Sequence, residues 1–231
     1  VDPRRFGPYA TRGYLKEKNE EAYANVFTTH YPDEERSAAR PLKTAPCYDR
    51  MKALGAVFGT VYGWERPNWF MPSADYSLSA EELNQEDPEK VLMNKNHATA
   101  LEDGRIVEKN SFRRSNYFEH VGNECKHVND KVGLLDMSAF AKCIVKGPGA
   151  EEWLEYIFAN KMPKAIGRIS LVHMLSLNGG VRAEFTVYKT GPQSYYLVSA
   201  GAFETHDHDY LFKLAPKDGS VNIQRVTTQT G

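Results

Sequence analysis

The second half of the chain shows the alternation of apolar and polar positions that is typical of β-strands. Two such runs are separated by Asn178, Gly179 and Gly180, and an Asn-Gly pair between strand-like runs predicts a tight hairpin turn. A second turn at 190–194 leads to a third run, so that three strands follow one another as an antiparallel meander. The strands predicted in this half are residues 142–146, 169–177, 181–189, 195–200 and 221–226.

Apolar residues at intervals of three and four predict helices beside these strands. Val121, Cys125, Val128 and Val132 form the stripe of an amphipathic helix that Gly133 ends. Because the adjacent strands are joined by turns rather than by crossover helices, the predicted fold class is α+β, an antiparallel β-meander packed with helices. Further helices are predicted at 11–29, 47–54, 150–158 and 203–214.

The first 110 residues are less regular. Residues 31–46 contain three prolines and alternating charges, which support no regular element, and residues 55–62 read as a strand. The segment GWERPNWF (63–70) gathers three aromatic residues around a charge pair. We interpret it as a packing plug between substructures, with ligand contact as the alternative. The polar stretch 76–110 is predicted to be a surface excursion between two packed regions.

Composition narrows the class of protein. The 231 residues include 29 Lys and Arg against 30 Asp and Glu, a net charge of −1 that argues against a nucleic-acid-binding module. No apolar run approaches the roughly 18 residues that span a bilayer, so no membrane segment is expected. The three cysteines, Cys47, Cys125 and Cys143, are an odd number and widely spaced. They are predicted to be reduced thiols of a cytosolic or organellar protein.

The second strand of the hairpin carries a candidate catalytic group. Its side chains alternate between two faces, and Arg182, Glu184, Thr186 and Tyr188 share one of them. If this face lines a cleft, Glu184 is a carboxylate on a rigid element that can act as a general base or stabilise a developing cation. The alternative is a glutamate that faces solvent, and the spacing alone is compatible with both.

The histidines and one glycine-rich turn point to no metal or dinucleotide site. His206 and His208 lie two residues apart and do not share a helical face, so we expect exposed histidines and no paired metal site. His173, in an apolar strand, is interpreted as a core histidine with satisfied hydrogen bonds. The turn at 146–149 follows a strand, as phosphate-binding turns do, but the third glycine of a G-x-G-x-x-G motif would fall at Glu152. Any dinucleotide cofactor is therefore expected to be bound elsewhere.

Several longer segments resemble the dimethylglycine and sarcosine dehydrogenases. HYPDEERSAARP (30–41) and GWERPNWF (63–70) are similar to the part of these enzymes that joins the flavin region to the folate region. The folate region is itself similar to the aminomethyltransferase (T-protein) of the glycine cleavage system. Four segments of this chain resemble the start of that folate region: SFRRSNYFEHVGNECKHV (111–128), LLDMSAFAKCIVKGPGA (134–150), IFANKMPK (157–164) and GGVRAEFTV (179–187).

The resemblance implies an FAD-dependent oxidoreductase of one-carbon metabolism. FAD, bound outside this chain, takes a hydride from an N-methyl amine to give an iminium, and tetrahydrofolate captures the carbon as 5,10-methylene-tetrahydrofolate. In T-proteins the hairpin reads G-G-x-x-D-D, and its second Asp lies at the reactive folate nitrogens. Glu184 matches that Asp and is longer by one methylene, about 1.5 Å. Ala200 stands where the T-protein has an Asn. The implied folate contacts are Phe140, Leu171, Tyr196 and Val198.

The implied plan has three parts: a connector from the flavin domain (1–75), the surface excursion (76–110) and the first portion of the T-protein-like folate-binding domain (111–231). Because the chain begins at Val1, we expect it to be the interior of a larger flavoprotein or a separate subunit, in a bacterial cytoplasm or the mitochondrial matrix. The expected partners are an N-methyl amine, folate, the rest of the same polypeptide, and either an electron-transfer flavoprotein or oxygen as electron acceptor.

Two alternatives of a different class stay open. One is a non-catalytic interaction or scaffold module that keeps the T-protein-like fold without folate, which Ala200 favours. The other is a stand-alone aminomethyltransferase-like protein.

Overall fold

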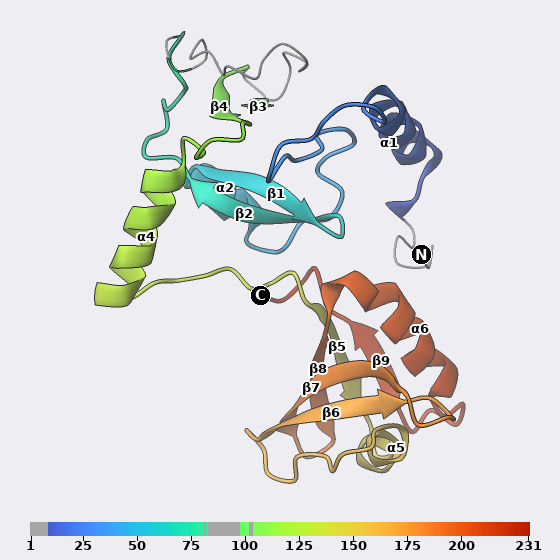
Figure 1. Cartoon of the computed structure of the whole chain (residues 1–231). Helices are drawn as coiled ribbons and strands as arrows, with labels where there is room; N and C mark the ends of the chain where they lie inside the picture. The colour runs from blue at the N-terminus through green and yellow to red at the C-terminus, as the bar shows by residue number, and fades with distance from the viewer. Residues whose placement is uncertain (1–8, 81, 83–97, 102–103) are drawn as a thin grey trace. The chain divides into compact units, whose positions relative to one another are not determined.

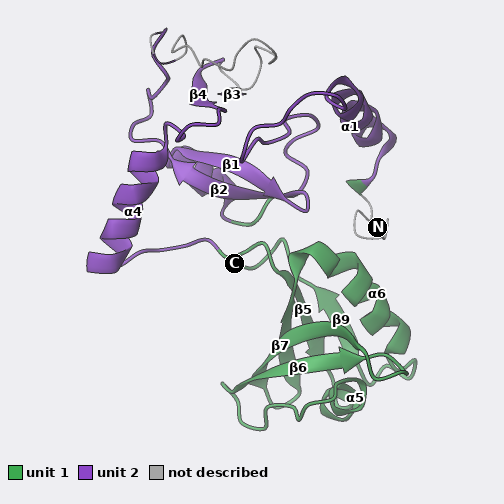
Figure 2. Cartoon of the chain, in the orientation of Figure 1, with its two compact units in different colours: residues 1–9, 44–46, 137–231 green, residues 10–43, 47–136 purple. Residues whose placement is uncertain are grey.

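The computed structural model describes residues 9–80, 82, 98–101 and 104–231. The chain divides into two compact units (Figures 1 and 2). Unit 1 consists of residues 1–9, 44–46 and 137–231, and unit 2 consists of residues 10–43 and 47–136. No helix of the described part of the chain is long and apolar enough to cross a membrane.

Unit 1 is built on a five-stranded sheet with the strand order β6-β7-β8-β5-β9. All of its neighbouring strands run antiparallel, so the predicted meander of β6, β7 and β8 is confirmed. The strands are β5 (Ala141–Lys146), β6 (Ile169–Leu175), β7 (Val181–Gly191), β8 (Ser194–Ser199) and β9 (Asn222–Arg225). The helices are α5 (Ala150–Ile157) and α6 (Glu204–Leu214), the latter after a 3₁₀ turn, η4, at Gly201–Phe203.

Both helices of unit 1 contribute to one core against the sheet. Trp153 and Leu154 of α5 and Leu211 of α6 belong to the same buried cluster as the inward-facing strand residues. Alternate positions of β7 enter this core through Phe185 and Val187, as the strand period requires. The fully buried side chains of the cluster include Val145, Leu154, Val172, Val187, Leu197 and Leu211.

The glycine-rich turn between β5 and α5 has a structural role. Gly147 has a φ of +134°, and a Cβ on this residue would lie 2.2 Å from the carbonyl oxygen of Ser220. Its N–H donates to the carbonyl of Gln193 at 3.0 Å. Close packing of backbone against backbone therefore explains the glycine here.

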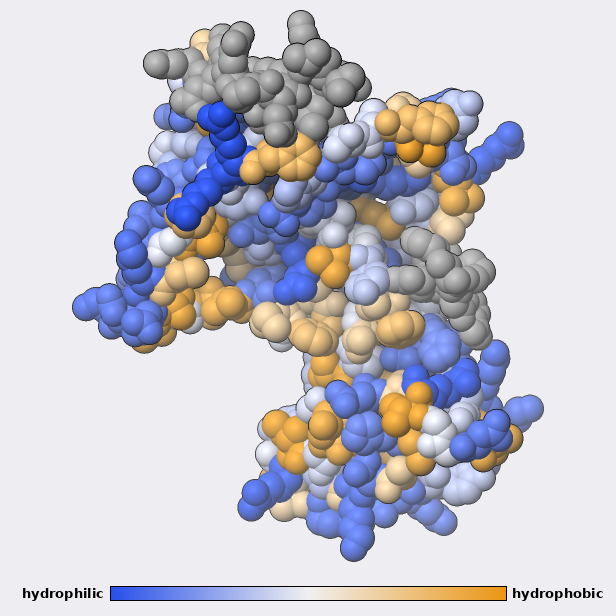
Figure 3. All heavy atoms as spheres, in the orientation of Figure 1, coloured by the Kyte–Doolittle hydropathy of each residue, from blue (hydrophilic) through white to orange (hydrophobic). Residues whose placement is uncertain are grey.

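The opposite face of the sheet carries apolar side chains that remain accessible. Ile169 and Leu171 of β6 are 61% and 54% exposed, and Tyr188 of β7 is 36% exposed. Several apolar residues are visible at the surface of unit 1 in Figure 3. This open face includes the positions that the family resemblance assigns to folate.

Unit 2 contains two β-hairpins and three helices among the described residues. Strand β1 (Ala56–Val61) pairs with β2 (Trp64–Phe70), and β3 (Ala98–Ala100) pairs with β4 (Ile106–Lys109). Val57, Trp69 and Val107 form the buried centre of the unit. The helices are α1 (Arg12–Ala24), α2 (Tyr48–Ala53) and α4 (Phe118–Asp130).

The segment GWERPNWF forms strand β2, and its predicted packing role is seen inside unit 2, where Trp69 joins Val57 of β1 and Val107 of β4 in one buried cluster. Trp64 and Trp69 are each 1% exposed within unit 2, and Glu65 between them forms an ion pair with Arg40 at 2.7 Å. A register shift between Val57 and Phe58 interrupts the pairing of β1 with β2. Such a bulge breaks the period-2 alternation, which is the main sign of a strand in a sequence.

Other expectations for unit 2 change in detail. Leu78 and Val107, which lie in the stretch expected to be a surface excursion, are buried, because β4 packs into the centre of the unit. The parts of that stretch at 81, 83–97 and 102–103 lie outside the described residues. Helix α4 ends at Asp130, and Val132 of the predicted stripe is beyond it and 86% exposed.

Candidate functional site

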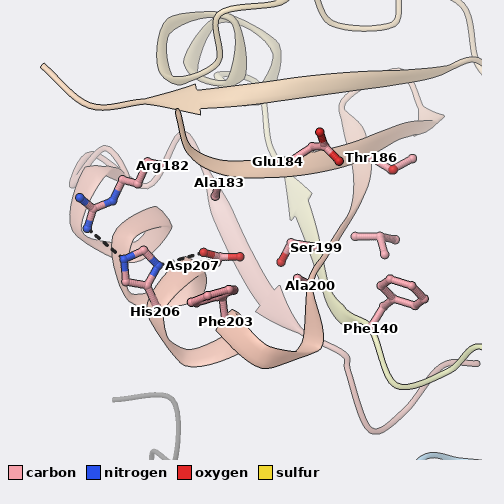
Figure 4. Close-up of a pocket in the computed structure, with 11 residues that line it drawn as sticks. Phe140, Arg182, Ala183, Glu184, Thr186, Ser199, Ala200, Phe203, His206 and Asp207 are labelled. Carbon is pink, nitrogen blue, oxygen red and sulfur yellow. Dashed lines mark hydrogen bonds and ion pairs between the residues drawn. The ribbon is translucent and has the colours of Figure 1, made fainter. Parts of the chain in front are cut away.

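A cavity of about 520 Å³ opens in unit 1 between β7, β8 and the start of α6. Figure 4 shows its lining from these elements and from Phe140, which precedes β5. The walls combine aromatic and aliphatic side chains with a carboxylate at one side and a cluster of Arg, His and Asp at the other. The lining residues are Phe140, Arg182, Ala183, Glu184, Thr186, Val198, Ser199, Ala200, Phe203, His206 and Asp207.

The structure places Glu184 in the wall of this cavity, on β7. Its side chain is 59% exposed, and its Oε2 lies 3.3 Å from Nε2 of His173, the residue opposite it on β6. The other ring nitrogen of His173, Nδ1, lies 3.2 Å from Oδ1 of Asn160. The carboxylate is thus oriented by one imidazole and still accessible to a ligand.

The interpretation of His173 as a core histidine is wrong. Its side chain is 35% exposed and lies on the open face of the sheet, where it contacts Glu184. The strand looks apolar throughout because the open face is itself apolar at Ile169 and Leu171. Hydropathy alone therefore does not distinguish the two faces of β6.

Three of the five residues implied by the resemblance come together around the cavity. Glu184, Phe140 and Val198 line it, and Val198 pairs across the strands with Thr186, another lining residue. The other two residues lie on the adjoining open face. Leu171 is opposite Thr186 on β6, and the hydroxyl of Tyr196 lies 2.8 Å from Oγ1 of Thr230. Neither of these two lines the cavity itself.

The opposite side of the cavity holds a cluster that the sequence reading assigned no role. Nδ1 of His206 lies 3.0 Å from Oδ1 of Asp207, and an NH2 group of Arg182 lies 3.3 Å from Nε2 of the same imidazole. Asp207 is only 3% exposed. Burial raises the pKa of its carboxyl group, and the hydrogen bond from His206 opposes that rise.

The prediction of exposed histidines at the start of α6 fails for His208. This residue is 1% exposed and packs inward, and burial lowers the pKa of its imidazole to about 4. His206 instead faces the cavity, so the two histidines do lie on different faces of the helix, as predicted. His208 and Leu211 are three residues apart and therefore share the buried face of α6. This spacing is the feature of the sequence that could have shown His208 to be buried.

None of the three cysteines lines the cavity. All three cysteines are free thiols, and Cys143 is buried in the core, which raises the pKa of its thiol to about 12. Among the residues that the structure describes, no group of three or more His, Cys, Asp or Glu side chains is arranged to hold a metal ion.

Comparison with known proteins identifies two families in one chain. The GCVT N-terminal domain family matches residues 47–231, and the FAD dependent oxidoreductase central domain family matches residues 1–45. The structure resembles that of glycine cleavage system aminomethyltransferase T from Bartonella henselae, with a TM-score of 0.50 at 18% identity. That match covers 80% of this chain and 38% of the other, and it confirms the α+β fold class.

The sequence relatives include mitochondrial dehydrogenases that are much longer than this chain. Mouse mitochondrial dimethylglycine dehydrogenase is 33% identical over 100% of this chain, and human mitochondrial sarcosine dehydrogenase is 23% identical over 91% of it. The mouse mitochondrial pyruvate dehydrogenase phosphatase regulatory subunit is 28% identical over 98% of the chain. The chain spans 23% of the length of the mouse dehydrogenase. The resemblance to the dimethylglycine and sarcosine dehydrogenases is confirmed, and through residues 47–231 the chain belongs to the GCVT N-terminal domain family.

Proposed function

We propose that this chain is the folate-binding part of an FAD-dependent dehydrogenase of N-methyl amines, of the dimethylglycine and sarcosine type. The observation that carries the proposal is the order of the two families. An oxidoreductase segment at 1–45 leads directly into a T-protein-like segment at 47–231, and the latter contains a cavity with a carboxylate in its wall. The mitochondrial names of the relatives favour the mitochondrial matrix over a bacterial cytoplasm.

The cavity has the size and lining that a reduced folate requires. Its volume of about 520 Å³ falls within the roughly 300–1,000 Å³ that is usual for small-molecule sites. Phe140, Val198 and Phe203 offer apolar and aromatic surface for a flat ring system, and Glu184 offers an acceptor for its N–H groups. The shape and chemistry of the wall therefore fit the ligand that the family suggests.

FAD is expected to bind outside this chain, since the chain carries no G-x-G-x-x-G motif. When bound, the flavin supplies the hydride acceptor that converts the amine to an iminium. The partners implied for this chain are accordingly the flavin-binding region, the amine and the folate. The electron acceptor, an electron-transfer flavoprotein or oxygen, would act on the flavin region.

Glu184 is proposed to accept a proton from folate during the transfer of the one-carbon unit. One folate nitrogen bonds to the methylene carbon of the iminium and must lose its proton, which the Glu184 carboxylate accepts. The second folate nitrogen then closes the ring as the carbon–nitrogen bond to the amine breaks. The protons lost by the two folate nitrogens leave with the departing demethylated amine, so the transfer is balanced without any further reactant. The negative charge of Glu184 also stabilises the cationic species formed on the way.

Replacing Glu184 with Gln in the full-length protein tests this role. Loss of a positioned general base typically costs about 10²–10⁴-fold, so methylene-tetrahydrofolate formation is expected to fall while amine oxidation continues. The iminium then hydrolyses, and formaldehyde accumulates in its place. Glu152→Gln, at an exposed position on α5, is the matched control and should leave the product ratio unchanged. An unchanged ratio in Glu184→Gln would refute the proposed role.

A regulatory module without folate is the second candidate, and one observation favours it. The mouse pyruvate dehydrogenase phosphatase regulatory subunit, whose name describes no oxidation, matches 98% of this chain. Ala200 also lines the cavity where the T-proteins have an Asn, so one polar contact is absent. Calorimetric titration with a reduced folate separates the two candidate functions, because a module that does not bind folate should give no saturable heat of binding.

A further inference from the structure

A β-bulge sets the direction of Arg182 at the edge of the cavity. In the pairing of β6 with β7, Met174 lies opposite Ala183, whereas the next residue, Leu175, lies opposite Val181. Arg182 is therefore the extra residue of β7 and has no partner on β6. Bulges of this kind re-aim a side chain and are frequent beside active sites. The pairing of β6 with β7 is thus interrupted at Arg182, a residue that lines the cavity.

The guanidinium of Arg182 is held by two contacts from α6. It lies over the ring of Tyr210, 3.9 Å from the centroid, and one of its NH2 groups lies 3.3 Å from Nε2 of His206. Because a guanidinium can only donate hydrogen bonds, Nε2 accepts and the proton of the neutral imidazole is on Nδ1. Nδ1 in turn donates to the buried Asp207. The three side chains form one chain of contacts that orients the cation (Figure 4).

The charge of Arg182 is not neutralised by a direct ion pair. Within the described ranges, no carboxylate lies within 4.0 Å of its guanidinium, and the charge of Asp207 reaches it across the His206 ring. Only one of its N–H donors is taken up by His206. Arg182 therefore offers a fixed fork of hydrogen-bond donors in a ligand-sized cavity, the arrangement that recognises carboxylates with two parallel hydrogen bonds.

We propose that Arg182 binds a carboxylate group of the ligand, at the end of the cavity opposite Glu184. A ligand that reaches both ends carries nitrogen centres and a carboxylate joined by a spacer, and Phe203, which is edge-on to His206 at 6.2 Å, provides an aromatic wall between them. The aminobenzoyl-glutamate tail of a folate has this chemistry. The identification of the ligand as a folate tail rests on the proposed function, whereas the carboxylate-binding site rests on the geometry of Arg182.

The test uses N-(4-aminobenzoyl)-L-glutamate, which has the tail and lacks the pterin. Titrating it into the full chain is expected to shift the ring nitrogen signals of His206 in ¹⁵N NMR, because the guanidinium that bonds to Nε2 is engaged by the probe. Arg182→Gln should weaken this binding about 10-fold or more, as expected for charge-assisted hydrogen bonds, and Arg182→Lys should restore part of it. Arg168→Gln, an exposed arginine of the same unit, is the control and should bind like the wild type.

The outcomes separate the site from the proposed function. Equal binding by the wild type and Arg182→Gln, or no shift of His206 in the wild type with either this probe or N,N-dimethylglycine, would overturn the carboxylate site even if reduced folate binds normally. A His206 shift that depends on Arg182, in a protein that binds no reduced folate, would keep the site and overturn the proposed function. N,N-dimethylglycine is titrated in parallel, and a response to it alone would keep the site and assign the carboxylate to the amine substrate.

Discussion

Mild acid is expected to destabilise unit 1 through His208. The imidazole is 1% exposed, and Nδ1 has no hydrogen-bond partner within the described part of the chain. Burial lowers its pKa from 6.5 to about 4, and the positive charge of Arg225 adds to this effect. In the unfolded chain the same imidazole accepts a proton near its ordinary pKa.

The sign and size of the effect follow from this difference in pKa. A group whose pKa is depressed by folding contributes its full share of stability above its unfolded pKa, and that share is lost as the pH falls towards the folded value. The loss therefore begins near pH 6.5 and continues to about pH 4. At 1.36 kcal/mol for each pKa unit, the limit is about 3 kcal/mol, of which about 2 kcal/mol is reached by pH 5.

The measurement is urea denaturation at pH 7.5 and pH 5, followed through the amide NMR signals of β5 and β8 so that unit 1 is observed directly. His208→Leu, which packs a similar volume without a titrating group, should lose about 2 kcal/mol less stability than the wild type over this interval. His127→Gln, at an exposed histidine of α4, is the control. Equal pH dependence in wild type and His208→Leu would refute the reasoning, because the acid sensitivity would then come from other groups.

Two further predictions concern the stability of unit 1. Gly147→Ala should lower the free energy of unfolding, measured by urea denaturation, by at least about 2 kcal/mol, because the added Cβ would lie 2.2 Å from the Ser220 carbonyl oxygen. Gly179→Ala is also at positive φ but has open space around it, so it should lower the free energy of unfolding by only about 1 kcal/mol. Similar costs at the two glycines would contradict the packing argument. Glu151→Gln should cost about 1 kcal/mol near neutral pH, because the carboxylate is partly exposed and binds the nearly buried Lys189 at 2.7 Å. Hydrogen bonds from Lys189 lower the pKa of Glu151 to about 2, so this contribution should fade as the pH falls from about 4.5 towards 2 in a wild-type and variant comparison.

Much of unit 1 could be predicted because its elements are local. The Asn-Gly turn and the alternation around it are properties of neighbouring residues, and the strands and helices of 141–225 lie within a few residues of the predicted bounds. The position of Glu184 beside a ligand-sized cavity is predicted only through the family resemblance, since the spacing alone favours a surface glutamate.

The features that escaped prediction depend on contacts that are distant in the sequence. The bulge at Arg182 depends on the register between two strands, which the alternation along one strand does not reveal. His208 looks like a surface histidine in a polar stretch, and only the packing of α6 against the sheet makes it buried. In unit 2, Trp69 bonds through Nε1 to Glu108, thirty-nine residues later, so neither residue shows its role by itself.

The central claim is that the cavity of unit 1 binds a reduced folate. Isothermal titration calorimetry of the full-length protein with 5-formyltetrahydrofolate tests it most directly, with Phe140→Ala as the variant that removes one wall of the cavity. We predict saturable one-to-one binding that Phe140→Ala weakens. The absence of saturable heat up to ~1 mM folate, which corresponds to a binding free energy weaker than about −4 kcal/mol, would contradict the claim.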